Sequence, residues 1–302
     1  MSYDYKLTIL TPTYNRASNL GKLYLSLTEQ TNCNFQWLIL DDGSDDDTDA
    51  VVHGFSKDNI HIDYYKKTNG GKHTALNYAH PYIKGEWTCI VDSDDFLTND
   101  AVDSILYYID AYNSVDKVGV ISFLRGADIS SPFNKDFPDK PFVSNHINFR
   151  VNANRGGDCC EVVRTEILKE HPFPEFKGER FLGEGYLWNY TGFHYNTLYV
   201  NKVIYICEYL EGGLTKSGRS MRIACPLGGM ANSQSFFEKV KERKVSLKVL
   251  IKEAMLYVCY GKFARYGFSR LVRNTNRPFL VALLYLPGFS LYKYWNLKYK
   301  EK

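Results

Sequence analysis

The feature that most restricts the possible folds is a repeated pattern in the first 112 residues: an apolar stretch, a polar turn and then a helical pattern. The four apolar stretches begin near residues 6, 35, 60 and 86. After the first of them, Leu20, Leu23 and Leu27 recur at helical spacing behind Ser18 or Asn19 as the helix cap. Four consecutive strand-helix units predict an α/β fold with a mainly parallel, doubly wound sheet flanked by helices.

Polar side chains gather where each predicted strand ends. The clusters are residues 12–16, 41–47, 69–72 and 92–95. In a doubly wound sheet, ligands bind beyond the carboxyl ends of the strands. The shared position of the four clusters therefore favours a functional site over four unrelated solvated loops.

The most unusual cluster is "CIVDSDDF", in which three carboxylates follow a buried strand within four positions. Carboxylates this close repel one another unless a cation or water lies among them. Because side chains alternate along a strand, we expect Asp92 and Asp94 on one side and Asp95 on the other. The pair Asp92 and Asp94 could hold a hard divalent cation that also binds a diphosphate, and a solvated loop is the alternative.

Two further clusters have residue types that suit a nucleotide. Asp41 and Asp42 close the second strand, where a carboxylate can accept the N3 proton of a pyrimidine and so select uridine over cytidine. Residues 45–47 are expected to cap the following helix. In "TNGGKH", Gly71 and Lys72 would offer exposed backbone N–H groups and a cation to phosphate oxygens, with a plain Gly-rich turn as the alternative.

Cysteine use and the N-terminal segment predict a cytoplasmic protein. The seven cysteines are scattered, without a CxxC pair or a histidine at metal-ligand spacing, so we expect neither a disulfide framework nor a structural zinc site. The start "MSYDYKLTIL" lacks the basic end, apolar run and cleavage site of a signal peptide.

The last part of the chain is strongly basic. Residues 241–302 contain 14 Lys and Arg against three Glu, so they carry +11, while the first 240 residues carry −8. The apolar run near the end is about 14 residues long and is broken by Pro287, too short for a transmembrane span. With its basic and aromatic flanks, we expect residues 233–302 to form a helical region that associates with the anionic inner leaflet of the plasma membrane. A helix pair packed on the domain is the alternative, and no nucleic-acid module accompanies the charge.

The segments "TPTYNR", "LDDGSDDDT", "NGGKHTALNYA" and "VDSDD", in this order and spacing, resemble the family-two glycosyltransferases with the GT-A fold. The resemblance is closest to bacterial enzymes of capsule or other surface-polysaccharide assembly, and it covers roughly residues 5–215. It implies a GT-A domain over residues 1–232, with a nucleotide-sugar donor half (1–115) and an acceptor half (116–232), followed by the C-terminal region.

The resemblance also implies the ligands and the residues that bind them. The donor would be a UDP-sugar, the metal Mn²⁺ or Mg²⁺, and the acceptor a glycan that the basic tail leads us to expect on a lipid. The donor site would comprise Pro12, Tyr14, Arg16, Asp41, Asp42, Gly71, Lys72, Asn77, Asp92 and Ser93. Asp92 and Asp94 would bind the metal, and the transfer would invert the anomeric centre.

The general base departs from the family pattern. Members usually carry a Glu-Asp pair at the start of an acceptor-side helix, with the Asp as base, whereas "FLGEGYLWN" has Glu184 followed by Gly185. We predict Glu184 as the base and Asp158 as the second candidate; a helix cap and a turn residue are the respective alternatives. The missing Asp leaves open a catalytically silent protein that binds sugar nucleotides or serves as an assembly scaffold.

Overall fold

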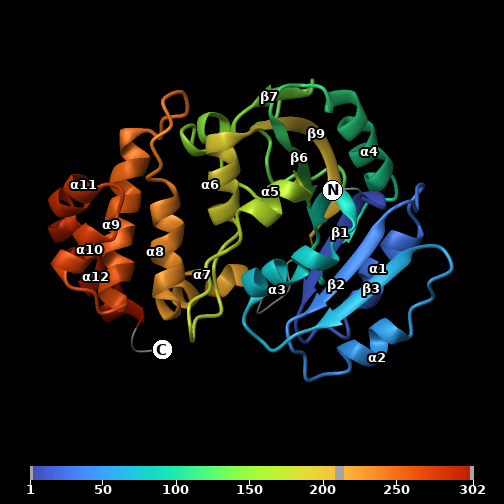
Figure 1. Cartoon of the computed structure of the whole chain (residues 1–302), viewed down its shortest axis with the longest axis horizontal. Coiled ribbons are helices and arrows are strands. Elements are labelled where there is room, and N and C mark those ends of the chain that lie inside the picture. Colours follow the sequence, from blue (N-terminus) through green and yellow to red (C-terminus); the bar gives the residue numbers. More distant parts are fainter. Residues whose placement is uncertain (1–2, 208–213, 300–302) are drawn as a thin grey trace. The chain divides into compact units, whose positions relative to one another are not determined.

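The structure, a computed structural model, describes residues 3–207 and 214–299 and divides the chain into two compact units (Figure 1). Unit 1 comprises residues 1–145, 155–172 and 194–209. Unit 2 comprises residues 146–154, 173–193 and 210–302. Each unit has its own buried apolar core.

Unit 1 is built on one sheet. Within the described residues, nine strands form it in the order β3-β2-β1-β4-β8-β6-β9-β5, with β7 paired to β9. The strands are β1 (Tyr5–Thr13), β2 (Gln36–Asp41), β3 (His61–Lys66), β4 (Gly85–Ile90), β5 (Phe96–Leu97), β6 (Val118–Gly126), β7 (Phe142–Ser144), β8 (Cys159–Arg164) and β9 (Asn196–Ile206). The helices of this unit are α1 (Leu20–Thr28), α2 (Thr48–His53), α3 (Lys72–Ala79), α4 (Ala101–Tyr112) and α5 (Thr165–Glu170).

The sheet confirms the predicted α/β class and adds antiparallel pairs to it. β3, β2, β1 and β4 are parallel neighbours, and a helix connects β1 to β2, β2 to β3 and β3 to β4. β8 runs antiparallel to both β4 and β6, and β5 and β7 run antiparallel to β9. β6 and β9 form a further parallel pair outside the predicted strand-helix repeats, so the complete sheet is mixed.

Apolar residues on both faces of the central strands explain why helices cover both sides. Leu7 and Ile9 of β1 are fully buried in one cluster with α1 and α4. Leu10, on the opposite side of β1, is also fully buried. Strands buried on both faces read as continuous apolar runs rather than alternating ones, as these strands do.

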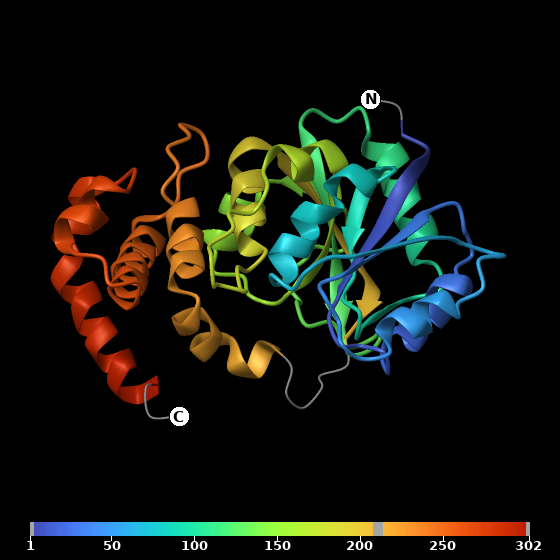
Figure 2. The same cartoon turned by 60° about the horizontal axis from the view of Figure 1, so that its bottom comes forward.

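Unit 2 is mainly helical. Its helices are α6 (Gly185–His194, whose last residue belongs to unit 1), α7 (Leu214–Ala224), α8 (Pro226–Ser235), α9 (Leu247–Phe263), α10 (Phe268–Arg273), α11 (Pro278–Leu283) and α12 (Tyr285–Tyr299). Helix α9 lies beside both α8 and α12 (Figure 2). Its Tyr260 ring meets Trp295 of α12 with ring centroids 5.9 Å apart.

The unit boundaries differ from the division expected at residue 232. Residues 146–154 and 173–193, assigned to the acceptor half by resemblance, share a unit with the C-terminal helices. The reason is a common apolar cluster in which Ile147 and Phe193 pack with Val245. Among the described residues, no helix is both long and apolar enough to cross a membrane.

Candidate active site

The polar clusters predicted from the sequence follow neighbouring strands of unit 1. β3, β2, β1 and β4 lie side by side in parallel, and Thr13 and Asp41 are paired at the ends of β1 and β2. The segments that follow these four strands therefore leave the sheet at one edge. Hydrogen bonds and ion pairs link the four segments to one another, so the structure confirms that the clusters meet.

The turn after β1 is held against the turn after β2. The Asn15 N–H donates to Ser44 Oγ (2.9 Å), and the Asp45 N–H donates to Asn15 Oδ1 (3.0 Å). Asn15 adopts a left-handed conformation with φ of 52°, which asparagine tolerates better than most residues. This turn carries two predicted donor-site residues, Tyr14, which is 43% exposed, and Arg16, which is half-buried.

Of the three aspartates expected to cap α2, only Asp46 binds the start of the helix. Its carboxylate accepts the N–H groups of Thr48 (3.1 Å) and Ala17 (3.1 Å). Desolvation alone raises the pKa of Asp46, but the Thr48 hydroxyl, which also donates to this carboxylate, and the two N–H groups together hold the pKa below its usual value. Asp47, next to the helix, makes no side-chain cap.

Asp41 is completely buried and bonded within the protein. Its Oδ1 accepts the Ser44 N–H (2.7 Å), and its Oδ2 accepts the Tyr64 hydroxyl (2.7 Å). Burial and the Asp41 carboxylate together raise the pKa of Tyr64, so this tyrosine stays a donor. Asp41 therefore stabilises the turn after β2 through hydrogen bonds in the protein interior.

Asp42 fastens the Gly-rich segment after β3 to the turn after β2. Its carboxylate accepts the N–H groups of Gly70 (3.0 Å) and Gly71 (2.6 Å), and it pairs with Lys67 Nζ (2.8 Å). Lys67 Nζ also donates to Thr74 Oγ1 (2.8 Å) at the start of α3. The side chain of Asp42 is only 4% exposed, so this network satisfies a buried charge.

These contacts correct one expectation for the Gly-rich segment. The N–H groups of Gly70 and Gly71 donate to Asp42, whereas the sequence predicted that they are exposed to phosphate oxygens. The reason is the close approach of the two turns. Gly43, at φ of +82°, has Asn69 N only 2.7 Å from the position that a Cβ would take. Only glycine fits there.

The carboxylates after β4 lie on a turn, whereas the sequence predicted a strand end, and their exposure alternates. The Asp95 N–H donates to the Asp92 carbonyl (3.2 Å), which closes the turn. The side chains of Asp92 and Asp94 are 29% and 28% exposed. Ser93 and Asp95 are buried. Asp92 and Asp94 are therefore the two carboxylates of this turn that a ligand can reach.

Three cations face these two carboxylates. Lys72 Nζ, at the start of α3, pairs with Asp92 Oδ1, and Arg125 Nη1 lies 3.9 Å from Asp92 Oδ2. Arg16 Nε lies 3.7 Å from Asp94 Oδ2. Burial raises the pKa of Asp92, but Lys72, Arg125 and Arg16 together hold the pKa below its usual value, so the carboxyl is ionised at neutral pH.

Tyr205 of β9 supports the turn from inside unit 1. Its hydroxyl accepts the Asp92 N–H (2.9 Å) and donates to Asp95 Oδ2 (2.8 Å). The Arg125 guanidinium stacks on the Tyr205 ring, 4.0 Å from its centroid. Burial and the neighbouring Asp92 charge raise the pKa of Asp95 to about 6.

Three residues of this site were not predicted. Lys67 directly follows β3, so it could have been identified from the rule that ligands bind beyond the carboxyl ends of the strands. Arg125 and Tyr205 had no such signal, because they lie on β6 and β9, and Tyr205 is 113 residues from Asp92 along the chain.

The other predicted residues lie on the expected elements. Pro12 is buried in β1, paired with Leu40 of β2. Asn77 is half-buried on α3. Asp158 is exposed immediately before β8, in the same unit as the carboxylate turn. Glu184 belongs to unit 2, where its carbonyl accepts the N–H groups of Leu187 and Trp188 in the first turn of α6.

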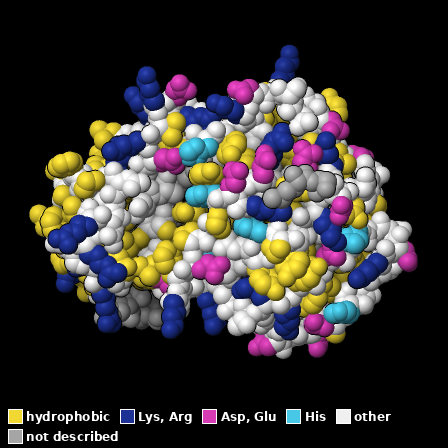
Figure 3. All heavy atoms as spheres, viewed as in Figure 1, with side chains coloured by type: hydrophobic (Ala, Val, Ile, Leu, Met, Phe, Trp, Pro, Cys, Tyr) yellow, Lys and Arg dark blue, Asp and Glu magenta, His cyan; other side chains and the backbone are white. Residues whose placement is uncertain are grey.

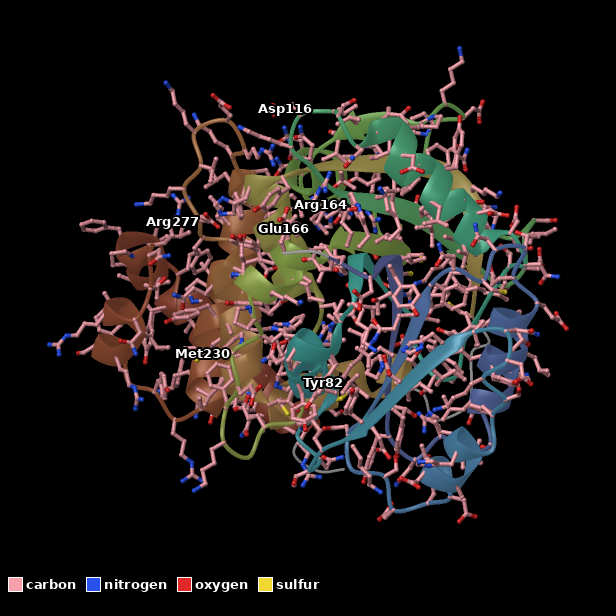
Figure 4. All side chains as sticks on the ribbon, turned by 45° about the vertical axis from the view of Figure 1, so that its right-hand side comes forward. Tyr82, Asp116, Arg164, Glu166, Met230 and Arg277 are labelled. Carbon is pink, nitrogen blue, oxygen red and sulfur yellow. The ribbon has the colours of Figure 1, made fainter. Side chains whose placement is uncertain are left out.

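A surface cavity of about 500 Å³ lies at the amino-terminal ends of β1 and β4, away from these strand ends. Arg164 and Glu166, labelled in Figure 4, are among its lining residues. Glu86 pairs there with Lys6 (3.5 Å) and with Arg164 (3.3 Å). Because these charges neutralise one another at the opposite edge of the sheet, the cavity is not part of the candidate site.

Comparison with known proteins places these observations in a family. Residues 8–170, more than half of the chain, match the family model described as "Glycosyl transferase family 2". Poly(ribitol-phosphate) beta-N-acetylglucosaminyltransferase TarS of Staphylococcus aureus is 25% identical over 176 residues, 56% of this chain and 30% of TarS. Minor teichoic acid biosynthesis protein GgaB of Bacillus subtilis is 28% identical over 179 residues, 58% of this chain and 20% of GgaB. The chain spans less than a third of the length of either relative.

Solved structures share the fold. A TarS fragment in complex with UDP superposes with a TM-score of 0.65 at 16% identity, covering 97% of this chain and 91% of that one. The mannosyltransferase PcManGT from Pyrobaculum calidifontis, in complex with GDP-Man and Mn²⁺, superposes with a TM-score of 0.58 at 17% identity, covering 99% and 87%. Both similarities confirm the expected fold class.

Proposed function

Because the chain belongs to glycosyl transferase family 2, we propose that it transfers a sugar from a UDP-sugar to a hydroxyl group of a lipid-linked glycan, with inversion at the anomeric carbon. One observation carries the proposal: Asp92 and Asp94 are accessible at the carboxyl ends of the parallel strands and face three cations. Carboxylates for a metal and cations for a diphosphate are the groups that a nucleotide-sugar donor requires.

The residues present fit a divalent metal bound together with a donor. Among the described residues, no group of three or more His, Cys, Asp or Glu side chains is arranged to hold a metal by itself. Mg²⁺ is usually held by one or two carboxylates plus substrate phosphates, which matches the pair Asp92 and Asp94. When bound, the ion would supply positive charge that offsets the charge on the departing nucleoside diphosphate.

The chain's own residues supply the remaining functions. Lys72, Arg16 and Arg125 place positive charge beside the carboxylates, where diphosphate oxygens would lie. Asp41 and Asp42 hold the turn that would meet the uracil. Since both carboxylates are bonded within the protein, we propose that Asp42 acts on the base mainly through the position of this turn.

A general base must remove the proton of the acceptor hydroxyl as that oxygen attacks the anomeric carbon. We propose Glu184 for this role, with Asp158 as the second candidate. Full transfer assays of Glu184→Gln and Asp158→Asn separate the two, because the base variant loses turnover and keeps donor binding. Exchange of Asp110→Asn, a 72% exposed carboxylate on α4, is the matched control.

The relatives and the basic tail support a proposal for the acceptor and the location. TarS is named for transfer to poly(ribitol-phosphate) and GgaB for minor teichoic acid synthesis, so anionic surface glycans are a reasonable acceptor class. We propose that the enzyme meets such a glycan on its lipid carrier at the inner face of the plasma membrane.

Calorimetric titration of the purified full chain with UDP, CDP and GDP, each with Mn²⁺ and with EDTA, tests the donor site. We expect UDP to bind more tightly than CDP or GDP and only with the metal. Preference for GDP, as in the PcManGT complex, would overturn the uridine assignment. Binding of all three without metal would overturn the role of Asp92 and Asp94.

One observation favours a second function, a sugar-nucleotide-binding protein without catalysis. Gly185 stands where the family usually has the Asp base. Its backbone leaves room for a side chain, since Asn232 Oδ1 lies 3.4 Å from the position of a Cβ. Normal metal-dependent UDP binding, with no turnover by the wild type and with turnover by Gly185→Asp, would establish this alternative.

A further inference from the structure

We propose that the exposed side of α11 and α12 binds the surface of an anionic lipid bilayer. This surface, the α11–α12 face, has an apolar part formed by Phe279, Leu283, Leu286 and Leu297. Its basic part is formed by the exposed side chains of Lys293 and Lys298 on α12 and of Arg273, the last residue of the preceding helix α10. The inference rests on unit 2 alone and stands or falls independently of sugar transfer.

The apolar part of the face is unusually exposed. Phe279 is 90% exposed, Leu283 76%, Leu286 72% and Leu297 74%. Phe279 and Leu283 are four residues apart on α11, and Leu286 and Leu297 are eleven residues, close to three turns, apart on α12. Each pair therefore lies on one side of its helix.

The opposite side of these helices is already used by the core of unit 2. Val281 and Gly288 are buried, and a Cβ on Gly288 would come within 2.6 Å of Val258 on α9. Trp295 packs against Tyr260. Packing of the unit thus accounts for the inward apolar residues and leaves the outward phenylalanine and leucines without a role in it.

The charge around the face has one sign. Residues 254–300 contain no Asp or Glu and eight Lys or Arg. Arg277, labelled in Figure 4, is used inside the unit, since its Nε donates to the Phe237 carbonyl (3.1 Å). Arg273, Lys293 and Lys298 are exposed instead. Figure 3 shows Lys and Arg gathered with hydrophobic side chains over α10, α11 and α12.

This combination selects a lipid surface over other partners. Two copies joined through this face would bring like charges together without a carboxylate to pair with them. A nucleic acid would match the charge but would leave the phenylalanine and leucines without an apolar partner. An anionic bilayer offers phosphate groups to the lysines and arginines and an acyl boundary to the apolar side chains.

Sedimentation of the full chain with vesicles tests the inference. We expect binding to vesicles of 30 mol% phosphatidylglycerol in phosphatidylcholine, weak binding to pure phosphatidylcholine, and reduced binding in 0.5 M NaCl, where charges are screened. The apolar variant F279S/L283S/L286S should lose most of the binding. The basic variant R273Q/K293Q/K298Q should lose about fivefold per charge, only on the anionic vesicles.

The matched control is L25S/Y107S in unit 1, because Leu25 and Tyr107 are also exposed, at 56% and 65%. It should bind vesicles as the wild type does. Thermal melting and UDP titration of every variant separate loss of the lipid surface from loss of the fold or of the donor site. The inference is overturned if the wild-type protein does not bind anionic vesicles, or if the apolar variant binds them as tightly as the wild type does. If the wild type is a dimer that does not bind vesicles, and the apolar variant is a monomer, then the face binds a second copy of the chain instead of a bilayer.

Discussion

The strand ends of unit 1 and the α11–α12 face of unit 2 differ in whether their charged side chains have partners of opposite charge. In unit 1, Asp42 pairs with Lys67, and Asp92 pairs with Lys72, so like charges at the strand ends are compensated within the fold. In unit 2, Arg273, Lys293 and Lys298 lie in a stretch of the chain without any carboxylate. Compensated charge organises a site before a ligand arrives, whereas uncompensated charge attracts an oppositely charged partner.

The largest effect should follow from removing the charge at the centre of the compensated site. Asp92→Asn keeps the size of the side chain but removes the carboxylate that faces Lys72 and Arg125. We expect sugar transfer to fall by roughly 10³-fold or more, because stabilisation of the leaving diphosphate is lost. Initial rates and metal-dependent UDP titration measure this loss.

Two results would contradict the assignment of Asp92. One is an Asp92→Asn variant with wild-type turnover. The other is an equal loss in Asp110→Asn, which exchanges an exposed carboxylate on α4 that pairs with Lys6. Equal losses would indicate a general electrostatic effect of unit 1 instead of a local one.

The second effect concerns the buried carboxylate that joins two turns. In Asp42→Asn, an amide NH₂ must face the donors Gly70, Gly71 or Lys67, so we expect stability to fall by about 3 kcal/mol. Donor binding should weaken because the Gly-rich segment loses its anchor. Chemical denaturation and UDP titration measure the two changes.

The same variant separates a positioning role from direct contact with the base. If Asp42 acts through the turn, UDP and CDP binding weaken by the same factor. If its carboxylate accepts the N3 proton of uracil, the amide reverses the hydrogen-bond preference, and UDP loses more affinity than CDP. A shift in the ratio of the two affinities would reject the positioning role.

The third effect tests the support beneath the carboxylate turn. Tyr205→Phe removes the hydroxyl that bonds the Asp92 N–H and Asp95, so we expect about a tenfold loss in kcat and about 1–2 kcal/mol of stability. Tyr199→Phe changes another buried tyrosine of β9, which packs on Phe137 and Phe142, and serves as the control. Similar kinetics for the two variants would remove Tyr205 from the site.

The sequence predicted the parallel half of the fold well, because strand and helix periods alternate there. Leu20, Leu23 and Leu27 are fully buried, as the helical spacing indicated. The antiparallel strand β8 and the shared cluster of Ile147, Phe193 and Val245 were not predictable in this way. They depend on contacts between residues far apart in the chain, which local periodicity does not encode.

The site followed the same rule. Asp42 and Asp92 were identified because each follows a strand directly. Gly71 and Lys72 follow β3, so the sequence predicted that they lie near Asp42 and Asp92 but not which residues bond to each other. Lys67, also after β3, was not predicted. The prediction that the Gly71 N–H is exposed was therefore wrong. Tyr205 was missed because its role depends on the pairing of β9 with β5 and β6.

The smallest expected effect comes from the titration of His146 in unit 2. Burial and the nearby Arg150 lower the pKa of His146 to about 3, so this histidine is neutral in the fold. The unfolded state takes up a proton below about pH 6.5 and the folded state does not, so stability falls as the pH drops from 6.5 toward 3. The loss attributable to His146 should reach at most about 2 kcal/mol at pH 5.

Calorimetric melting at pH 7.5 and at pH 5.0 measures this loss. The decrease in melting temperature between the two pH values should be smaller in His146→Gln than in the wild type. His53→Gln, at an exposed histidine of unit 1, is the control and should leave the decrease unchanged. An equal decrease in wild type and His146→Gln would show that the acid sensitivity arises elsewhere.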